Sequence, residues 1–246
     1  MNEPSVRMLQ KVIPAVVSIS TEGIVKSGRA APDRLFDDLF GTGDGKRRAL
    51  GTGSGFFVTA DGFVVTNHHV IRGAAGDGIT VTTQDGKTYA ARLIQSDETR
   101  DLALLKMEAK EAFSFIRLDD LSPNLLGQTV FAIGNPHALG TSVSRGILSA
   151  RARTLPPFRR GGKEAADLLQ TDAALNPGNS GGPIVDLSGK LVAVSRLVYT
   201  GDEERQAQGI SFGVPGNIVR MKIEEFMRKA GDSSRSPKPA IVVPGL

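Results

Sequence analysis

Short apolar runs separated by turn residues make up most of the sequence, and they fall into two groups. The first group occupies residues 15–20, 55–59, 62–67, 79–83, 88–94 and 101–107, and the second occupies residues 129–133, 143–150, 183–185, 191–198 and 210–214. Runs of this length at close intervals, without alternating helices, are typical of all-β proteins. The 29 glycines and 13 prolines among 246 residues also favour many turns. The sequence therefore predicts two small β-barrels or sandwiches packed together.

Two helices are predicted outside these runs. Residues 217–229 place apolar side chains on one helical face, and Gly231 follows as a C-terminal stop. Residues 5–12 form a shorter candidate that Pro14 ends. The polar, Pro-containing stretch at residues 118–127 is the expected crossover between the two groups of strands.

Composition excludes several classes of protein. No stretch approaches the roughly 18 consecutive apolar residues that a membrane-spanning helix needs. Residues 1–7 contain no apolar signal core, so either the protein is not exported or a leader has been removed. The absence of cysteine excludes disulfides, a thiol nucleophile and cysteine metal sites, and three histidines are too few for an all-histidine zinc site. We therefore expect no metal and no cofactor, and the net charge of +4 does not by itself call for nucleic acid or an anionic membrane.

A candidate nucleophile, Ser180, lies in the run NPGNSGGP at residues 176–183. A nucleophilic serine needs a tight turn that exposes its hydroxyl, and glycines on both sides allow the backbone to form one. The N–H groups of Gly178 and Ser180 would then form an oxyanion hole. The same residues are also common in ordinary turns, so this run alone does not exclude a turn without a catalytic role.

A base and an acid are available in the first group of strands. The run TNHHV at residues 66–70 follows an apolar strand, and on a continued strand its two histidines would point to opposite faces. Asp101 precedes the apolar run at residues 102–105, where a buried carboxylate could orient a histidine. The alternatives are half-buried histidines at a strand end and an acid that is simply the last exposed residue before the core. Taken with Ser180, these residues predict a site in the cleft between the two groups of strands.

Six runs in order then identify a resemblance. They are GTGSGF (51–56), TNHHV (66–70), DLALL (101–105), IGNP (133–136), QTDAALNPGNSGG (170–182) and GISFGVP (209–215). Over nearly its whole length, the chain resembles the HtrA/Deg family of serine proteases. The resemblance implies an all-β, chymotrypsin-like fold of two six-stranded β-barrels with short N-terminal and C-terminal helices. It also implies that His69, and not His68, is the base, that Asp101 orients it, and that Ser180 attacks the substrate.

Residues near the nucleophile give expectations about activation and specificity. Trypsin-like proteases have, directly before the nucleophile, an aspartate that pairs with a newly cut N-terminus, whereas this chain has Asn179. We therefore expect control by loop rearrangement instead. Ala174 replaces the acid that trypsin-like specificity needs, and Leu175, Leu197 and Val198 match the family's S1 lining. These residues predict an apolar substrate pocket for a small or medium aliphatic P1 residue such as Val, Ala or Leu.

Arg196 and two loops depart from, or add to, this pattern. The family usually has a small residue, often Thr, at the position of Arg196. If Arg196 projects into the cleft, it belongs to the substrate pocket and alters or blocks a subsite; otherwise it faces solvent. By resemblance, residues 21–50, with Phe36 and Phe40, are a loop that reaches another subunit, and residues 155–167 are a regulatory loop that senses an activator. The alternatives are a floppy loop and a solvated charged surface.

The predicted function is that of a serine endopeptidase of protein quality control, which cleaves unfolded or misfolded proteins through an acyl-enzyme at Ser180. A latent protease that acts as a chaperone or binding module is the main alternative, and an esterase is a more distant one. The expected partners are unfolded polypeptides and two further copies of the chain in a homotrimer, with no nucleic acid and no stable membrane insertion. The expected location is the periplasm or cell envelope if a leader or anchor was removed, and is otherwise unknown.

The expected domain organisation follows the same resemblance. A trypsin-like protease domain spans residues 1–231, with barrels at about 14–118 and 127–215 and a closing helix at about 217–230. Residues 232–246 are expected to be a tail or linker. We expect no PDZ domain within this chain, although the family usually has one or two after the protease helix.

Overall fold

The computed structural model describes residues 3–23, 48–74, 78–135, 140–155, 165–176, 178–198 and 209–231. Strands dominate these residues, as the spacing of the apolar runs predicts. The elements in chain order are α1 (Pro4–Val12), a 3-10 turn (Ile13–Ala15), β1 (Val16–Gly23), β2 (Arg48–Phe57), β3 (Phe63–Thr66), α3 (His68–Ile71), β4 (Ile79–Thr82), β5 (Thr88–Asp97), β6 (Leu102–Met107), β7 (Thr129–Gly134), β8 (Ser142–Leu155), β9 (Ala165–Thr171), β10 (Pro183–Asp186), β11 (Leu191–Val198), β12 (Ser211–Pro215) and α4 (Gly216–Lys229).

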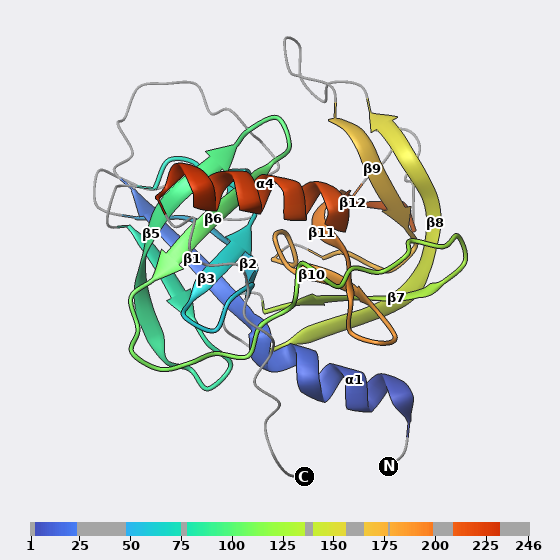
Figure 1. Cartoon of the computed structure of the whole chain (residues 1–246), viewed down its shortest axis with the longest axis horizontal. Helices are drawn as coiled ribbons and strands as arrows, with labels where there is room; N and C mark the ends of the chain where they lie inside the picture. Colours follow the sequence, from blue (N-terminus) through green and yellow to red (C-terminus); the bar gives the residue numbers. More distant parts are fainter. Residues whose placement is uncertain are drawn as a thin grey trace.

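Two closed barrels of six antiparallel strands contain all of these strands (Figure 1). The strand order is β1-β2-β3-β6-β5-β4 in the N-terminal barrel and β10-β11-β12-β9-β8-β7 in the C-terminal barrel. Tight turns join neighbouring strands where glycine permits a positive φ, as at Gly62 (φ 95°) between β2 and β3. The chymotrypsin-like double barrel expected from the resemblance is therefore confirmed.

The second barrel differs in two places from the sequence prediction. The run expected at 143–150 continues to Leu155, and β9, which begins at Ala165, was not predicted at all. Residues 165–167 of the predicted regulatory loop are therefore part of a strand. In β9 the two central leucines, Leu168 and Leu169, are buried while Asp167 is exposed, so the apolar signal is too short to stand out.

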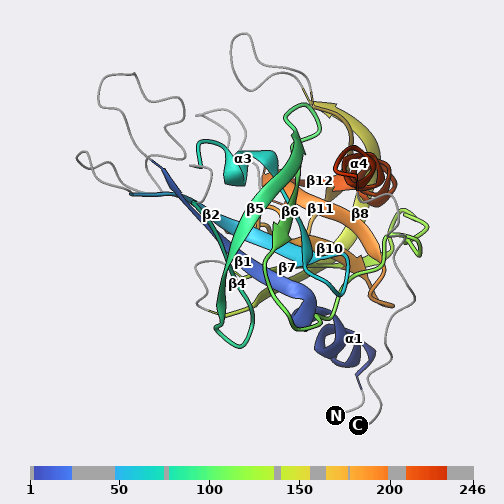
Figure 2. The ribbon, with the colours of Figure 1, turned by 60° about the vertical axis from the view of Figure 1, so that its left-hand side comes forward.

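One hydrophobic core joins the two barrels and the terminal helices, in addition to a smaller cluster within each barrel. It combines side chains from α1, both barrels and α4, among them Met8, Phe56, Phe131, Val194 and Phe226. Figure 1 shows α4 lying across both barrels, and Figure 2, in which α4 is seen end-on, shows α1 at the opposite end of the molecule. Because this core is continuous, the facing ends of the two barrels are held at a fixed separation, which positions residues contributed from each side.

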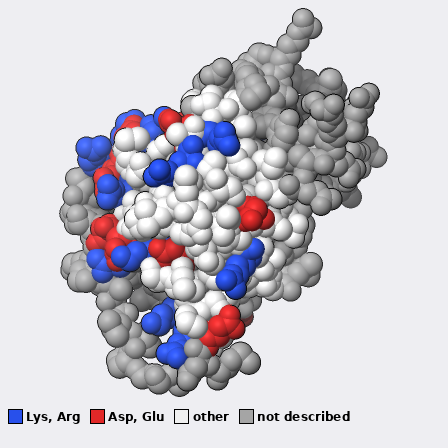
Figure 3. Space-filling view, turned by 90° about the vertical axis from the view of Figure 1, so that its right-hand side faces the viewer, with Lys and Arg blue, Asp and Glu red and all other residues white. Residues whose placement is uncertain are grey.

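The charged side chains on one face of the molecule, shown in Figure 3, are of both signs. Basic and acidic side chains are interspersed there, and neither sign predominates among the described residues. No helix in the described ranges is both long enough and apolar enough to cross a membrane.

Candidate active site

His69 and Asp101 form a tightly bonded pair in the N-terminal barrel. Strand β3 ends at Thr66, and the short helix α3 turns the His69 side chain toward Asp101, which directly precedes β6. His69 Nδ1 lies 2.8 Å from Asp101 Oδ2, and the His69 backbone N–H donates to Asp101 Oδ1 over 3.0 Å. An ionised carboxylate only accepts hydrogen bonds, so Nδ1 is the donor and Nε2 is left as the acceptor. This is the tautomer that a general base needs.

The carboxylate of Asp101 is ionised although it is buried. Burial raises the pKa of Asp101, but the charge and hydrogen bonds of His69 and the charge of Arg196 together lower that pKa below its usual value. The Asp101 backbone has a positive φ of 55°, a conformation that aspartate tolerates better than most residues. Asn67 Nδ2 donates to the Asp101 carbonyl over 2.8 Å and helps to hold this conformation.

Ser180 approaches this pair from the C-terminal barrel. The Ser54 backbone N–H in β2 donates to the Ser180 carbonyl over 2.8 Å. Gly53 lies between the two halves of the site, since a Cβ there would be 2.7 Å from Val70 Cγ2 and 3.1 Å from the Ser180 carbonyl oxygen. Val70 directly follows His69, so the close approach at Gly53 brings the segments of the predicted base and nucleophile together.

Within the described residues, the backbone around Ser180 leaves two N–H groups without an acceptor. Asn179 N–H donates to Asn176 O (3.0 Å), Gly181 N–H to Ser195 O (3.0 Å) and Gly182 N–H to Asn179 O (2.9 Å). Among the residues that the structure describes, the N–H groups of Gly178 and Ser180 donate to no protein atom. These are the two groups that the sequence predicts for the oxyanion hole.

One link of the predicted triad is not formed. The Ser180 side chain is half-buried, and no hydrogen bond within the described ranges joins its hydroxyl to His69. Catalytic hydrogen bonds often tighten only when substrate binds. The structure therefore brings together His69 and Asp101 directly, and Ser180 through shared backbone contacts.

The neighbouring histidine has a different partner. His68 Nδ1 lies 3.1 Å from Ser96 Oγ, on the β5 side of α3. The chain turns into α3 at His68 and does not continue as a strand, so the two histidines do not alternate across a strand. They nevertheless have different partners.

The predicted pocket residues lie in two places. Leu175 is buried in a cluster of the C-terminal barrel, whereas Ala174 is exposed and its carbonyl accepts a hydrogen bond from Ser144 Oγ over 2.6 Å. The backbone of Leu197 and Val198 belongs to β11, but their side chains lie outside the described residues. Phe36 and Phe40 and most of the predicted regulatory loop also lie outside the described ranges.

Arg196 does not face solvent. Its side chain is 15% exposed, and its Nε lies 3.2 Å from Asp101 Oδ2, the oxygen that also binds His69. Contact with Asp101 was not among the sequence-based expectations, which placed this side chain in the substrate cleft or in solvent.

Sequence reasoning also missed two serines that support the nucleophile. Ser54 Oγ donates to the Gly178 carbonyl over 2.6 Å, and Ser195 Oγ donates to the carbonyls of Asn179 and, over 3.0 Å, of Gly182. Both serines are buried in strands. A serine at a buried position between apolar or glycine neighbours was the available signal, because a buried hydroxyl needs a partner.

Asn179, beside the nucleophile, is 1% exposed, and its amide packs against Gly134. Neither its Oδ1 nor its Nδ2 has a hydrogen-bond partner in the described part of the chain. The Asn179 side chain therefore makes no counterpart of the ion pair that aspartate forms in trypsin-like proteases.

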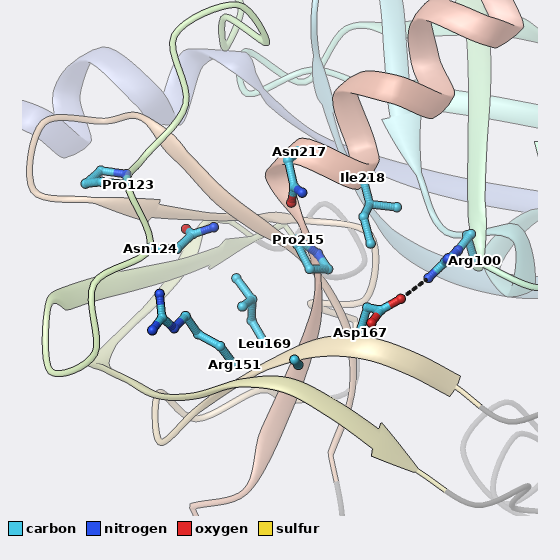
Figure 4. A pocket seen from close by; sticks show the side chains of 10 residues that line it. Arg100, Pro123, Asn124, Arg151, Asp167, Leu169, Pro215, Asn217 and Ile218 are labelled. Atoms are coloured by element: carbon cyan, nitrogen blue, oxygen red, sulfur yellow. Dashed lines mark hydrogen bonds and ion pairs between the residues drawn. The ribbon is translucent and has the colours of Figure 1, made fainter.

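A separate cavity of about 540 Å³ is shown in Figure 4. Its lining includes Arg100, whose guanidinium pairs with Asp167 across 3.2 Å, and the first turn of α4. None of the predicted triad, oxyanion-hole or pocket residues lines it. Within the described ranges, no group of three His, Asp or Glu side chains is arranged to hold a metal ion.

Comparison with known proteins gives consistent matches. Residues 53–194 match the family described as trypsin-like peptidase domain. The chain is 36% identical over 238 residues to a probable periplasmic serine protease do/HhoA-like of Haemophilus influenzae, covering 89% of this chain and 49% of the relative. It is 35% identical over 250 residues to a probable periplasmic serine endoprotease DegP-like of a Marinomonas species, covering 93% and 50%. A DegP-like relative of Rhizobium meliloti is 37% identical over 203 residues, covering 82% and 38%. The chain thus spans about half the length, or less, of these curated relatives.

Proposed function

Because this chain belongs to the trypsin-like peptidase family, we propose that it is a serine endopeptidase that uses His69, Asp101 and Ser180. The observation that carries the proposal is the pairing of the buried Asp101 with the half-buried His69, with Nδ1 bonded to the carboxylate at 2.8 Å and Nε2 left as an acceptor. Burying an ionised carboxylate costs free energy of folding, and such groups often occur at functional sites. The role that this geometry supports best is to orient a base.

The reaction follows from the groups present. Ser180 Oγ attacks the peptide carbonyl carbon while its proton passes to His69 Nε2, and Asp101 stabilises the resulting imidazolium. The N–H groups of Gly178 and Ser180 donate hydrogen bonds to the developing oxyanion. Collapse of the tetrahedral intermediate breaks the C–N bond, and the leaving amine takes the proton from His69. Water, deprotonated by His69, then hydrolyses the acyl-enzyme and restores Ser180.

The proposed specificity is for small or medium aliphatic P1 residues. Leu175, five positions before the nucleophile, is apolar, and Ala174 offers no charge to a basic side chain. An apolar wall without an acid favours Val, Ala or Leu over Lys or Arg because a buried cation would be left unpaired. Leu197 and Val198 complete the proposed pocket.

We further propose a role in quality control of unfolded or misfolded proteins, as a homotrimer in the periplasm. The chain is 34–38% identical to relatives named probable periplasmic serine proteases, which supports a shared setting. Sedimentation would test the assembly, and a monomer at micromolar concentration would contradict it.

A second candidate function is a latent protease that acts as a chaperone or binding module. The observation that favours it is the missing hydrogen bond between Ser180 and His69 in the described structure. In this alternative the triad residues are present but the resting geometry is inactive.

Digestion of β-casein distinguishes the two candidates. We would compare the wild type with Ser180→Ala and with Ser188→Ala, which removes an exposed hydroxyl from a turn away from the site. Cleavage by the wild type and Ser188→Ala but not by Ser180→Ala, with cuts after Val, Ala or Leu in mass spectra, supports the protease. Absence of cleavage by all three folded proteins, with suppression of aggregation of a denatured client, supports the alternative.

A further inference from the structure

Arg196 occupies a β-bulge in β11. Ser195 pairs with Gly213 and Leu197 pairs with Phe212, so the register shifts between them and Arg196 has no partner of its own in β12. A bulge leaves its extra residue out of the ladder and re-aims that side chain, and bulges are frequent beside active sites. Here the side chain reaches from the C-terminal barrel to Asp101, which belongs to the N-terminal barrel.

The contact of Arg196 with Asp101 is largely shielded from water. The side chains of Arg196 and Asp101 are 15% and 9% exposed, and the Nε···Oδ2 distance is 3.2 Å. The same Oδ2 accepts the hydrogen bond of His69 Nδ1 at 2.8 Å. The guanidinium and the imidazole therefore lie about 6 Å apart or less, on one carboxylate oxygen, where a charge is weakly screened.

The other titratable groups near this pair have other partners or are exposed. His68 on α3 contacts Ser96, Asp97 at the end of β5 pairs with Lys222 of α4, and Arg100 before β6 pairs with Asp167 of β9. The remaining charged side chains on the elements packed against α3 and β6 are exposed, have other partners or lie outside the described residues. The exposed ones are Glu22 on β1, Arg72 after α3, Arg92 on β5, and Arg220, Glu224, Arg228 and Lys229 on α4. Lys106 on β6 binds Asp61, Glu225 on α4 binds Lys222 and Lys229, and the side chain of Arg48 on β2 is outside the described residues. Arg196, in contrast, contacts the Asp101 carboxylate directly.

We propose that Arg196 is a positioning residue, which clamps the Asp101 carboxylate and extends the activity of the triad to lower pH. The inference rests on the proposed function, because it concerns how the proposed base works. A cation on Asp101 Oδ2 cancels part of the carboxylate's charge, so proton uptake by the His69 imidazole becomes less favourable. The base stays unprotonated at lower pH but is weaker, which slows proton abstraction at higher pH.

The expected result is a pair of pH profiles that cross. In Arg196→Gln, the acid limb of kcat/KM moves to higher pH by about one unit, so activity on that limb falls about tenfold. At pH values above this limb, kcat/KM of Arg196→Gln equals or exceeds that of the wild type. Arg196→Lys keeps the charge, so it retains the wild-type acid limb. Arg196→Thr introduces the small residue usual at this position and is expected to show the same shift as Arg196→Gln. It replaces Arg196→Gln if that variant folds poorly. Arg117→Gln is the matched charge control, because Arg117 pairs with Asp119 in the crossover.

A second measurement does not depend on turnover. The His69 ring is titrated by NMR in folded Ser180→Ala and in Ser180→Ala/Arg196→Gln, each labelled at the histidine C2 carbon. A midpoint about one unit higher in the double variant supports the inference even if the wild type shows no proteolysis, which would defeat only the proposed function. Equal midpoints, or a loss of activity that is uniform across pH with an unmoved acid limb, would overturn the inference and leave Arg196 a merely structural residue.

Discussion

Replacing Ser54 by Ala tests how the nucleophile turn is held. Ser54 is completely buried in β2, and its hydroxyl donates to the Gly178 carbonyl over 2.6 Å and accepts from the Asn135 N–H over 2.8 Å. One side-chain atom of the N-terminal barrel thus satisfies two backbone groups of the C-terminal barrel. The substitution removes this oxygen and leaves the remaining side-chain atom in place.

The magnitude follows from the two backbone groups that lose their partner. A buried donor or acceptor left unsatisfied costs about 1–3 kcal/mol. Since two groups are affected and the turn can relax partly, we expect the free energy of unfolding to fall by about 2–4 kcal/mol. A domain of ordinary stability, about 5–15 kcal/mol, remains folded after this loss. The freed Gly178 carbonyl lets the oxyanion N–H groups move, so we also expect kcat to fall at least tenfold while KM changes less.

Urea unfolding followed by circular dichroism measures the first effect, and steady-state cleavage of a peptide measures the second. Ser188→Ala is the matched control, because the exposed Ser188 hydroxyl donates to the side chain of Asp186 in the same turn. We expect little change in that variant. A Ser54→Ala protein as stable as Ser188→Ala, with unchanged kcat, would refute the argument that this hydroxyl couples the two barrels at the site.

Three further substitutions give distinct outcomes. Gly181→Ala abolishes cleavage and destabilises the fold, because Gly181 has φ 85° and a Cβ would collide with the Ser54 carbonyl; circular dichroism and casein digestion would measure both effects. Asn179→Asp places an unpaired carboxylate in a buried site, so the free energy of unfolding at pH 7 falls by about 2–4 kcal/mol. This loss of stability relative to wild type shrinks toward pH 4, where protonation removes the buried charge, and a loss that is independent of pH would contradict the prediction. The pKa of Asp97 is lowered, despite burial, by hydrogen bonds that include one from Lys222 at 2.9 Å. Lys222→Gln therefore reduces stability at pH 7 by about 0.5–1 kcal/mol. Because a lowered pKa stabilises fully above the unfolded value of about 4 and loses this contribution as the pH falls through the lower folded value, the difference from wild type begins to shrink below about pH 4 in urea titrations.

Most strands could be predicted from the sequence, but β9 could not. Runs such as residues 101–107 were found because their apolar residues form a continuous buried strand, 0% exposed at Leu102, Leu104 and Leu105. Strand β9 was missed because its buried leucines are only two and its first residues are polar or small. Its place in the barrel comes from pairing with β8 and β12, which no local pattern encodes.

The candidate site shows the same division. The pairing of Asp101 with a histidine could be predicted from residue types and from the resemblance, since that chemistry requires those side chains. The direction of the Arg196 side chain could not, because it depends on a bulge that exists only in the register of β11 against β12. The short helix α3 was likewise missed, because four residues are too few for a helical period to appear in a sequence.

The Asp101 carboxylate links the stability of the barrel pair to the chemistry of the site. Burying an acid destabilises a fold unless each oxygen has partners, and here the partners come from α3 and from β11 in the other barrel. The positive φ of Asp101 adds a local cost that the hydrogen bond from Asn67 offsets. Strain and buried charge therefore coincide at one residue, and both are tolerated only while the two barrels remain packed together. It follows that separating the barrels even slightly would remove Arg196 from the carboxylate before it disturbed His69, whose bonds lie within a single barrel.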